Sequence, residues 1–260
     1  MNISKKHERM FEERMNYQSC IMRIVEYNNY DDIVVEFQDD YRTRVRTSYK
    51  HFINGNIKNP YYPSVYGVGI VGNKYFNWVN KKATKEYDAW KQMLRRCYDQ
   101  KLKEKYPTYK DVTCCKEWLL YENFYEWLHS QPNFNKWLNG DRWEVDKDVL
   151  DKRNKIYSPE NCYLVPHNVN TLFTKHDAGR GSLPVGITKN SKGFSVRCNN
   201  PLTGIREYLG TYKTIKESFG VYKYYKEDII KQVAQKEYDE NNITERCYKA
   251  MMNYKVEITD

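Results

Sequence analysis

The stretch Glu144–Asn170, EVDKDVLDKRNKIYSPENCYLVPHNVN, decides how this chain is interpreted, because it places acidic residues, asparagines and turns at short spacing. Together with Trp143, its first residues are typical of a short strand that delivers Asp146 and Asp148 at its end. Side chains alternate along a strand, so these two carboxylates point the same way. The stretch therefore begins with a strand that gathers carboxylates at one end.

The second half of the stretch predicts a returning strand and a helix. Polar turns are expected at 151–154 and at Ser158-Pro159-Glu160-Asn161. Cys162–Val165 is expected to form the second strand. Pro166 suits the first position of a helix, which puts Asn170 about one turn inside it.

A metal site follows from folding the two strands together and laying the helix across them. This arrangement would bring Asp146 and Asn170 close to each other. Two oxygen ligands with open positions suit a hard divalent cation such as Mg²⁺ or Mn²⁺, which keeps waters and takes phosphate oxygens as further ligands. The ordinary alternative is a polar turn that binds nothing.

These residues resemble the HNH endonuclease family, in which a ββα-metal finger cuts a DNA phosphodiester with one metal ion and one histidine base. In its phage homing members, the first strand ends in an Asp-His pair, an Asn follows in the central turn, and an Asn or His lies on the helix. Asp146 matches the metal-binding Asp, Asn161 matches the central Asn, and Asn170 matches the helix ligand. The resemblance implies metal ligands at Asp146 and Asn170 and places Asn161 in the catalytic loop, where it would fix the geometry.

Lys147 stands where that family has its general-base histidine. A lysine with its usual pKa near 10.4 is protonated at pH 7 and cannot take a proton from water. Two roles stay open for Lys147: a cation that stabilises a phosphate, or a base in a desolvated site. Lys147, Asp148 or a metal-bound water would have to replace the missing base.

The charge balance favours a polyanionic partner. The formal net charge is +9, and 25 tyrosines dominate an aromatic content of 15%. Basic residues concentrate in 81–110, including Arg95 and Arg96, a surface that would track the phosphate backbone of double-stranded DNA. The ordinary alternative for this run is a solvated helix face.

The cysteines and the lengths of the apolar runs indicate the cellular compartment of the protein. Seven cysteines, an odd number, favour reduced thiols over a disulfide framework. Zinc shared among Cys97, Cys114 or Cys115, and Cys162 is not expected, because paired ligand spacing is absent and buried core thiols are commoner. No apolar run approaches the roughly 18 residues of a membrane span, and no signal peptide is visible. We therefore expect a cytoplasmic protein that does not contact a membrane.

The first third of the chain predicts a small β domain after a charged helix near Ser4–Met15. Cys20–Val25 and Asp32–Phe37 have strand patterns, and Tyr41–Thr47 alternates so that three arginines share one face. That row would contact phosphate or, as the ordinary alternative, form a charged exposed strand face. Gly67–Gly72 matches the Gly-x-Gly-x-x-Gly dinucleotide motif, but a linker is expected because no helix pattern follows it.

The middle of the chain predicts two helices with aromatic core faces. One runs from a Thr84 N-cap through Tyr87, Trp90 and Cys97, and the second carries Trp118 and Leu128. We expect these aromatic residues to form a core that supports the finger rather than a platform for stacking bases. This order of helices and finger resembles a recurring architecture of phage HNH proteins.

Beyond a linker at Gly179–Gly186, the pattern predicts three strands and one helix. The strands are expected at 186–188, 193–198 and 206–212, and Thr214-Ile215-Lys216-Glu217 is a capping box for the helix. Alternation turns Phe194, Val196 and Cys198 toward the helix. The opposite face would then carry Ser195, Arg197 and Asn199, joined by Arg206 and Tyr208.

This segment resembles the AP2 DNA-binding domain over about sixty residues, with GITKNSKGFSVRC and EYLGTY matching its strands. The resemblance implies that the outer face of the sheet lies in the major groove, where arginine bonds guanine O6 and N7. Without the resemblance, the pattern predicts only an exposed sheet surface. The residues predicted to contact DNA are Arg180, Lys189, Lys192, Ser195, Arg197, Asn199, Arg206 and Tyr208, together with Arg95 and Arg96.

The sequence thus predicts an α+β protein in three parts: an N-terminal helix and small β domain at 1–78, helices with the HNH-like finger at 79–178, and the AP2-like domain at 179–260. The two resemblances imply a homing-like endonuclease, encoded by a phage or prophage, that nicks or cleaves double-stranded DNA in the bacterial host cytoplasm. The rival hypothesis is a DNA-binding regulator or counter-defence protein without nuclease activity. A third is an interaction protein that uses the tyrosine-rich surface against another protein.

Overall fold

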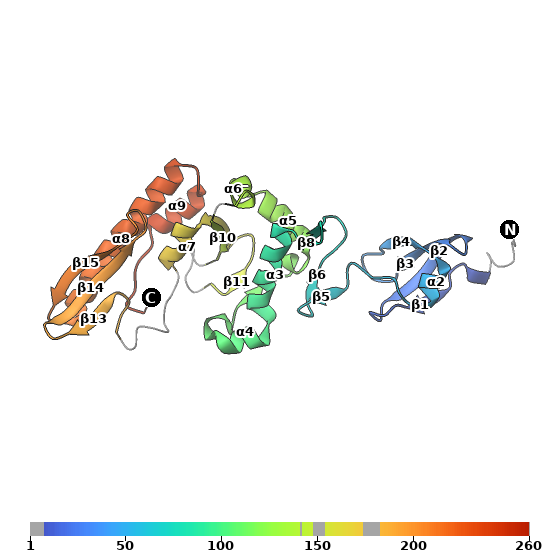
Figure 1. Ribbon diagram of the computed structural model, residues 1–260, viewed down its shortest axis with the longest axis horizontal. Helices are drawn as coiled ribbons and strands as arrows, with labels where there is room; N and C mark the ends of the chain where they lie inside the picture. Colours follow the sequence, from blue (N-terminus) through green and yellow to red (C-terminus); the bar gives the residue numbers. More distant parts are fainter. Residues whose placement is uncertain (1–7, 141, 148–153, 174–182, 260) are drawn as a thin grey trace. The chain divides into compact units, whose positions relative to one another are not determined.

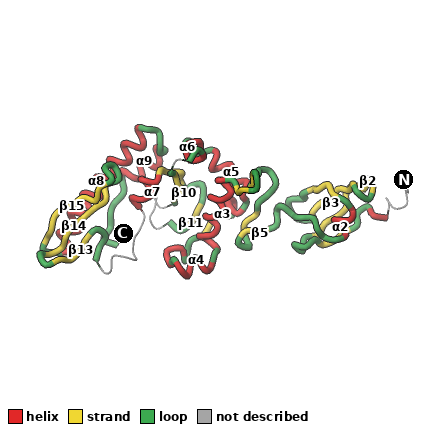
Figure 2. Tube along the Cα trace, viewed as in Figure 1, coloured by secondary structure: helices red, strands yellow, loops and turns green. Residues whose placement is uncertain are grey.

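The computed structural model describes residues 8–140, 142–147, 154–173 and 183–259. It is a mixed α+β structure in which small sheets and helices alternate along the chain (Figures 1 and 2). The chain divides into two compact units: Met1–Asp99 with Lys116–Phe124, and Gln100–Cys115 with Tyr125–Asp260. In the described ranges, no helix is both long enough and apolar enough to cross a membrane.

The first unit begins with an antiparallel sheet in the order β1-β2-β3-β4. Its buried core includes Ile24, Val35 and Phe37, with Phe52 from the following helix. The strands expected near 20–25 and 32–37 are confirmed, whereas the helix expected to reach Met15 is wrong, because the chain there pairs with β2. The elements are β1 (Glu13–Met15), β2 (Ile21–Asn29), β3 (Asp32–Phe37), β4 (Arg44–Thr47) and α2 (Tyr49–Ile53).

The arginine row on β4 forms ion pairs with the neighbouring strand. Arg44 Nε lies 2.9 Å from Glu36 Oε2, and Arg46 Nε lies 2.7 Å from Asp32 Oδ1. The hydrogen bonds from these arginines lower the pKa of both carboxyl groups. The row therefore forms the charged strand face that was the ordinary alternative, with cross-strand pairs of opposite charge.

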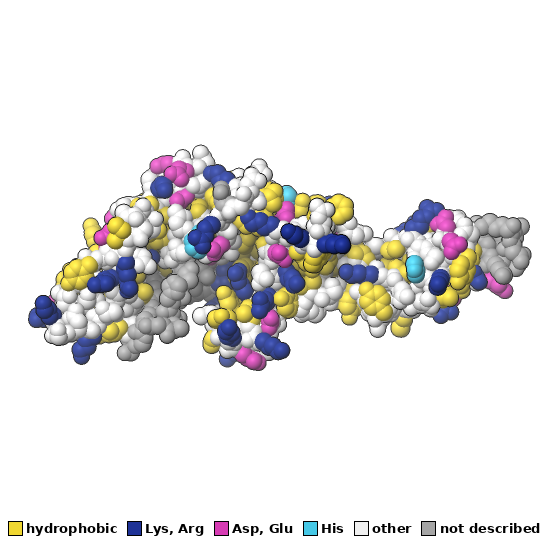
Figure 3. All heavy atoms as spheres, in the orientation of Figure 1, with side chains coloured by type: hydrophobic (Ala, Val, Ile, Leu, Met, Phe, Trp, Pro, Cys, Tyr) yellow, Lys and Arg dark blue, Asp and Glu magenta, His cyan; other side chains and the backbone are white. Residues whose placement is uncertain are grey.

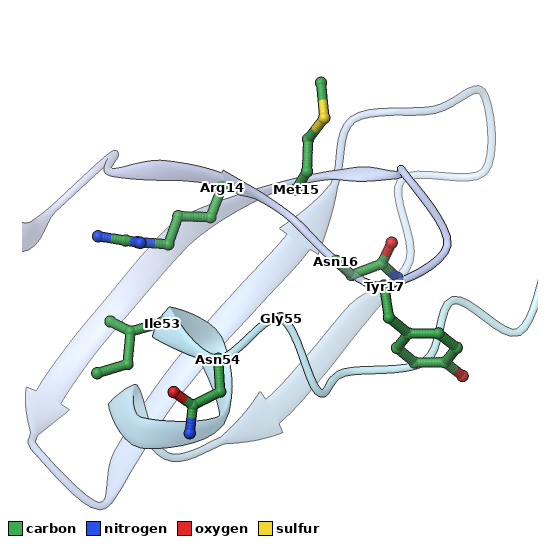
Figure 4. A pocket seen from close by; sticks show the side chains of 7 residues that line it. All are labelled: Arg14, Met15, Asn16, Tyr17, Ile53, Asn54 and Gly55. Carbon is green, nitrogen blue, oxygen red and sulfur yellow. The ribbon is translucent and has the colours of Figure 1, made fainter.

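A hollow of about 340 Å³ lies between β1 and the turn that follows α2 (Figure 4). Asn16, which lines it, is buried and uses its amide within the fold: Nδ2 donates to Ile57 O at 2.8 Å, and Oδ1 accepts from the backbone N–H groups of Gln18 and Cys20. This amide holds the turn before β2 in place.

Two short hairpins and helix α3 complete the first unit. Thr84 caps α3 as predicted, accepting from Tyr87 N at 3.2 Å.

The Gly67–Gly72 motif is not followed by a helix, because no helix begins at Gly72. The buried Glu122 carboxylate instead accepts the N–H groups of Asn73 and Lys74 at 2.8 and 2.7 Å. A Cβ at Gly72 would collide with that carboxylate. The elements are β5 (Pro63–Val65), β6 (Gly69–Ile70), β7 (Trp78–Val79), β8 (Lys82–Ala83), α3 (Lys85–Tyr98) and the 3-10 helix η2 (Glu117–Leu119), followed by α5 (Tyr121–His129), which continues into the second unit.

The second unit contains the predicted finger and the predicted sheet-and-helix module. The finger consists of two antiparallel strands followed by a helix, and the module is an antiparallel sheet in the order β13-β14-β15. The elements are α4 (Gln100–Lys105), η1 (Pro107–Tyr109), β9 (Thr113–Cys114), α6 (Phe134–Leu138), β10 (Trp143–Asp146), β11 (Ile156–Tyr157), β12 (Tyr163–Pro166), α7 (His167–Phe173), β13 (Ile187–Asn190), β14 (Gly193–Asn200), β15 (Ile205–Tyr212), α8 (Ile215–Asp239) and α9 (Glu245–Met252).

Helix α8 covers one face of the three-stranded sheet (Figure 1). Its capping box is present, because Thr214 Oγ1 accepts from Glu217 N while the Glu217 carboxylate accepts from Thr214 N. Val196 and Cys198 point into the core beneath the helix, as alternation predicted. Helix α9 packs on α8 and was not foreseen.

The finger and the module share one hydrophobic core. Val165 of β12 and Val169 of α7 are fully buried in the same cluster as Val196 and Ile230. A hydrogen bond of 2.6 Å from Asn168 Nδ2 on α7 to a Glu237 carboxylate oxygen on α8 adds to this packing. The boundary expected after 178 falls in 174–182, outside the described residues, and the segments on either side of it pack into one body.

Candidate functional site

The finger has the strand, strand and helix that the sequence predicted. Asp146 ends β10 opposite Tyr163, and Trp143 begins it opposite Pro166. Pro166 is the last residue of β12 rather than the first of the helix, so α7 begins at His167. The difference is one residue, and Asn170 still lies about one turn inside α7.

Asp146 is a buried carboxylate, with 5% of its surface exposed. Burial raises the pKa of the Cys247 thiol on α9 to about 12, and the negative charge of Asp146 adds to that shift. Burial also raises the pKa of Cys162, again with a contribution from Asp146. The carboxylate therefore acts electrostatically on two thiols of the second unit.

Glu144 lies two residues before Asp146, on the same face of β10. Its carboxylate contacts two polar side chains of α7. The amide Nδ2 of Asn170 donates to Glu144 Oε2, and His167 Nδ1 lies 2.7 Å from Glu144 Oε1. The sequence predicted that Asn170 lies beside Asp146. Asn170 reaches the expected face, but its amide contacts Glu144 instead.

Lys147 is also buried, with 7% of its surface exposed, and its ammonium is held by the loop. Lys147 Nζ donates to the backbone oxygen of Asn154 at 3.2 Å and lies 5.8 Å from the centre of the Tyr157 ring. The Asn154 side chain returns a hydrogen bond to the backbone oxygen of Lys147 at 3.2 Å. Two hydrogen bonds thus join Lys147 and Asn154, the residues on either side of 148–153.

Asn161 lies in the predicted turn and contacts the same loop. Asn161 N and Cys162 N both donate to Ser158 O, at 3.1 and 3.0 Å. Asn161 Nδ2 donates to Asn154 Oδ1 at 3.3 Å, and that oxygen also accepts the N–H of Ile156 at 3.0 Å. The Asn161 side chain therefore contacts Asn154, which is also bonded to Lys147.

Sequence reasoning missed three polar residues of the finger. Glu144 and His167 join β10 to α7, and Asn154 connects the two ends of the loop. The spacing of two residues between Glu144 and Asp146 could have predicted the role of Glu144, because residues two apart on a strand share one face. Nothing local indicated His167 or Asn154, since their partners lie on other segments. Asp148 and Arg180 lie outside the described residues.

The outer face of the β13–β15 sheet carries the predicted polar residues. Arg197, Asn199, Arg206 and Tyr208 are exposed. Arg197 pairs with Tyr208 across the strands, and its guanidinium lies 5.9 Å from the centre of that ring. Asn199 pairs with Arg206. In the part of the sheet that the structure describes, no Asp or Glu shares this face, because alternation puts Glu207 on the opposite side.

Two members of the predicted contact set are corrected. Ser195 lies on the outer face by alternation, between Thr188 and Thr211, but is only 8% exposed. Lys189 is exposed but falls on the same face as the buried Ile187, the side that carries α8. Lys192 is exposed in the turn between β13 and β14. The contiguous polar face is therefore formed by Arg197, Asn199, Arg206 and Tyr208.

Arg95 and Arg96 lie on α3 in the first unit. Arg95 Nε lies 3.4 Å from Asp99 Oδ2, one helical turn along. Part of the basic run therefore forms ordinary ion pairs on a helix surface. Ion pairs of this kind at i and i+4 contribute little to stability.

All seven cysteines are free thiols. Cys97 is buried in α3 of the first unit, while Cys114, Cys115 and Cys162 belong to the second. Across the described ranges, no group of three or more His, Cys, Asp or Glu is arranged to hold a metal ion.

Comparisons with protein-family models, curated proteins and solved structures find no match to this chain.

Proposed function

We propose that the chain binds double-stranded DNA through the outer face of the β13–β15 sheet and hydrolyses a phosphodiester at the finger with the help of Mg²⁺ or Mn²⁺. Two features that share one hydrophobic core support the proposal. A strand-strand-helix element carries Asp146 on β10 and Asn170 on α7, where Asn170 contacts Glu144, and the sheet that shares its core presents Arg197 and Arg206. Oxygen ligands and exposed arginines are the groups that phosphate chemistry on DNA requires.

In this proposal, the chain's own residues bind and orient the substrate. Arg197 and Arg206 would contact the duplex, and Tyr208, which contacts Thr211 Oγ1 through its hydroxyl at 2.9 Å, would pack beside them. Asp146 and the amide oxygen of Asn170 would hold the cation, with Glu144 fixing the orientation of the amide. A bound Mg²⁺ or Mn²⁺ would supply charge stabilisation at the scissile phosphate. Lys147 would add positive charge near the loop.

The cleavage part of the proposal is tested by a nicking assay on supercoiled plasmid with Mg²⁺ or Mn²⁺. We expect wild-type protein to nick DNA that it binds and Asp146→Ala to abolish nicking while it leaves binding unchanged. Glu160→Ala, a change in the exposed turn of the same finger, should retain activity. Absence of cleavage with any divalent metal, on DNA that the protein demonstrably binds, would exclude the enzyme.

The binding part is tested separately on duplexes selected from a random pool. Arg197→Ala and Arg206→Ala should each weaken specific binding by roughly 1–3 kcal/mol. Lys236→Ala, which removes a charge from the exposed end of α8, should not change base preference. Equal affinity for all sequences in wild type and variants would refute major-groove recognition by this face.

A second candidate function is a DNA-binding regulator that lacks nuclease activity. The observation that favours it is the position of Lys147, whose ammonium donates to Asn154 O where a base would be required. This candidate predicts duplex binding that depends on Arg197 and Arg206 but no nicking by wild-type protein. The plasmid assay described for Asp146 separates the two functions.

A further inference from the structure

The first unit contains a long segment without acidic residues. Between Asp40 and Glu86 the chain has nine lysines and arginines and not one Asp or Glu. The arginines of β4 form ion pairs with β3, but in the described structure Lys58, Lys81 and Lys82 make no ion pair with a carboxylate. The segment therefore presents uncompensated positive charge.

Two aromatic side chains of the same segment are exposed, one just before a tight hairpin and one on it. Strands β7 and β8 pair through Trp78↔Ala83 and Val79↔Lys82, and Asn80 and Lys81 form a turn with positive φ at both positions. Phe76 is 82% exposed and Trp78 is 54% exposed. A hairpin this short cannot bury these side chains by itself, so they are available to a ligand.

Trp78 also lines a hollow of about 360 Å³ in the first unit. Tyr66 and Tyr87 provide further aromatic groups, and Lys58 and Lys91 lie on its wall. The side chain of Asn77 hydrogen-bonds to Tyr87, whose pKa is raised mainly by burial. The hollow thus combines aromatic faces, two ammonium groups and a polar amide in a volume typical of small-ligand sites.

Arg95, a residue of the predicted DNA-contact set, acts on the same region. Burial raises the pKa of Tyr66, and the positive charge of Arg95 opposes that shift. The guanidinium is therefore close enough to the hollow to contribute to its potential. The negative charge of Asp99, which pairs with Arg95, acts on Tyr66 in the opposite direction, so the positive charge at the hollow comes mainly from Lys58 and Lys91.

We propose that this surface binds single-stranded DNA, with one unpaired base stacked on Trp78 in the hollow and the flanking phosphates bound by Lys58 and Lys91. Aromatic faces beside a positive groove are the combination by which proteins hold single strands, because every base has a face that stacks. Lys81 and Lys82 on the hairpin extend the positive surface along the strand.

A single strand fits this surface better than a duplex. In a duplex the base faces are stacked on one another, so Trp78 would contact only base edges or the backbone. An aliphatic protein surface as partner would leave Lys58 and Lys91 desolvated without a counter-charge, which is costly. The choice of DNA over RNA rests on the proposed function, whereas the stacking and phosphate contacts do not.

The test measures binding of fluorescein-labelled (dT)12 to the full chain by anisotropy, in an Arg197→Ala/Arg206→Ala background that weakens the sheet face. Trp78→Ala should weaken binding of this oligonucleotide about tenfold, within the range known for loss of one stacked base. Trp78→Phe, which keeps an aromatic ring, should retain most of the affinity. Tyr224→Ala removes an exposed aromatic side chain from α8 and should have no effect.

The salt dependence tests the phosphate contacts independently. Lys58→Ala/Lys91→Ala should reduce the slope of log K against log salt by about 1.4, because each phosphate contact to a single strand contributes roughly 0.7. Circular dichroism checks that each variant is folded.

Three results would overturn the proposal: unchanged (dT)12 affinity in Trp78→Ala, an equal loss in Tyr224→Ala, or tighter Trp78-dependent binding of single-stranded RNA. Loss of plasmid nicking in Asp146→Ala does not bear on these results, so the finger and this surface can fail separately.

Discussion

Asn170 donates the hydrogen bond of its side-chain amide to Glu144, a carboxylate on the neighbouring strand of the finger. Glu144 also contacts His167 Nδ1, so a single acidic side chain joins α7 to β10 at two points. Because Glu144 and Asp146 lie on one face of the strand, the contact sets the position of Asn170 relative to the predicted metal site. On the face of the molecule drawn in Figure 3, Lys and Arg side chains are scattered among Asp and Glu side chains.

Glu144→Ala should lower the affinity of the finger for Mn²⁺ about 10- to 100-fold, the usual cost of losing a side chain that orients a metal ligand. The physical reason is that the Asn170 amide nitrogen loses the carboxylate that accepts its hydrogen bond. Calorimetric titration with Mn²⁺ measures the change, with Glu160→Ala as the control. Identical dissociation constants for Glu144→Ala and wild type would show that Asn170 is not a ligand.

Lys147→His should raise the nicking rate by a factor on the order of 10², the range for a positioned general base. An imidazole in this position is able to accept a proton near neutral pH, whereas an ordinary lysine ammonium is not. Lys147→Asn is the matched control, because it loses the bond to Asn154 O without supplying a base. If the histidine variant is no faster than the asparagine variant, the finger lacks a functional arrangement of the remaining groups.

Asn154→Ala should destabilise the second unit by about 1–3 kcal/mol, because it leaves polar groups of the loop without their partners. The lost bonds include those with Lys147 O, Ile156 N and Asn161 Nδ2. Urea denaturation followed by circular dichroism measures the loss. Asn135→Ala, an exposed change on α6, should have little effect, and an equally small effect at Asn154 would mean that the loop is not held by these bonds.

Thr214→Ala should lower the free energy of unfolding by about 1 kcal/mol, since it removes the N-cap of the long helix α8. The hydroxyl accepts from Glu217 N at 3.2 Å, and serine provides the same acceptor. Thr214→Ser should therefore remain close to wild type in thermal unfolding. Equal losses in the two variants would assign the effect to the threonine methyl group rather than to the cap.

The cysteines should differ in reactivity at pH 8. Cys247, with its pKa raised to about 12, and the buried Cys162 form little thiolate, so iodoacetamide should modify Cys20, Cys114 and Cys115 first. Peptide mass spectrometry gives the order of modification. Early modification of Cys247 would contradict the packing of α9 on α8.

The same shift predicts a loss of stability in alkali. The pKa of Cys247 is higher in the folded protein than the ordinary value near 8.5 in an unfolded chain. Its contribution to stability is therefore fully present below about pH 8.5 and is lost as the pH rises toward 12. Cys247→Ala should flatten the dependence of unfolding free energy on pH in this interval.

Much of the local structure followed from the sequence alone. The strand ending at Asp146, the turn at Ser158–Asn161 and the cap at Thr84 were predicted because the residues that define them are neighbours in the chain. The same is true of the capping box at Thr214. Where the prediction was wrong, as at Glu13–Met15, a pairing with a strand further along the chain replaced the helix that local charge had suggested.

The sequence by itself determined the charge, the alternating faces of β14 and the order of strand, strand and helix in the finger, because these depend on composition and on spacings of two to four residues. Only the tertiary structure decided that Asn170 contacts Glu144, that Asn154 bonds to Lys147 and Asn161, and that the finger shares its core with α8. Such contacts depend on how separate elements pack, and packing is specified by the whole set of buried side chains rather than by any one segment.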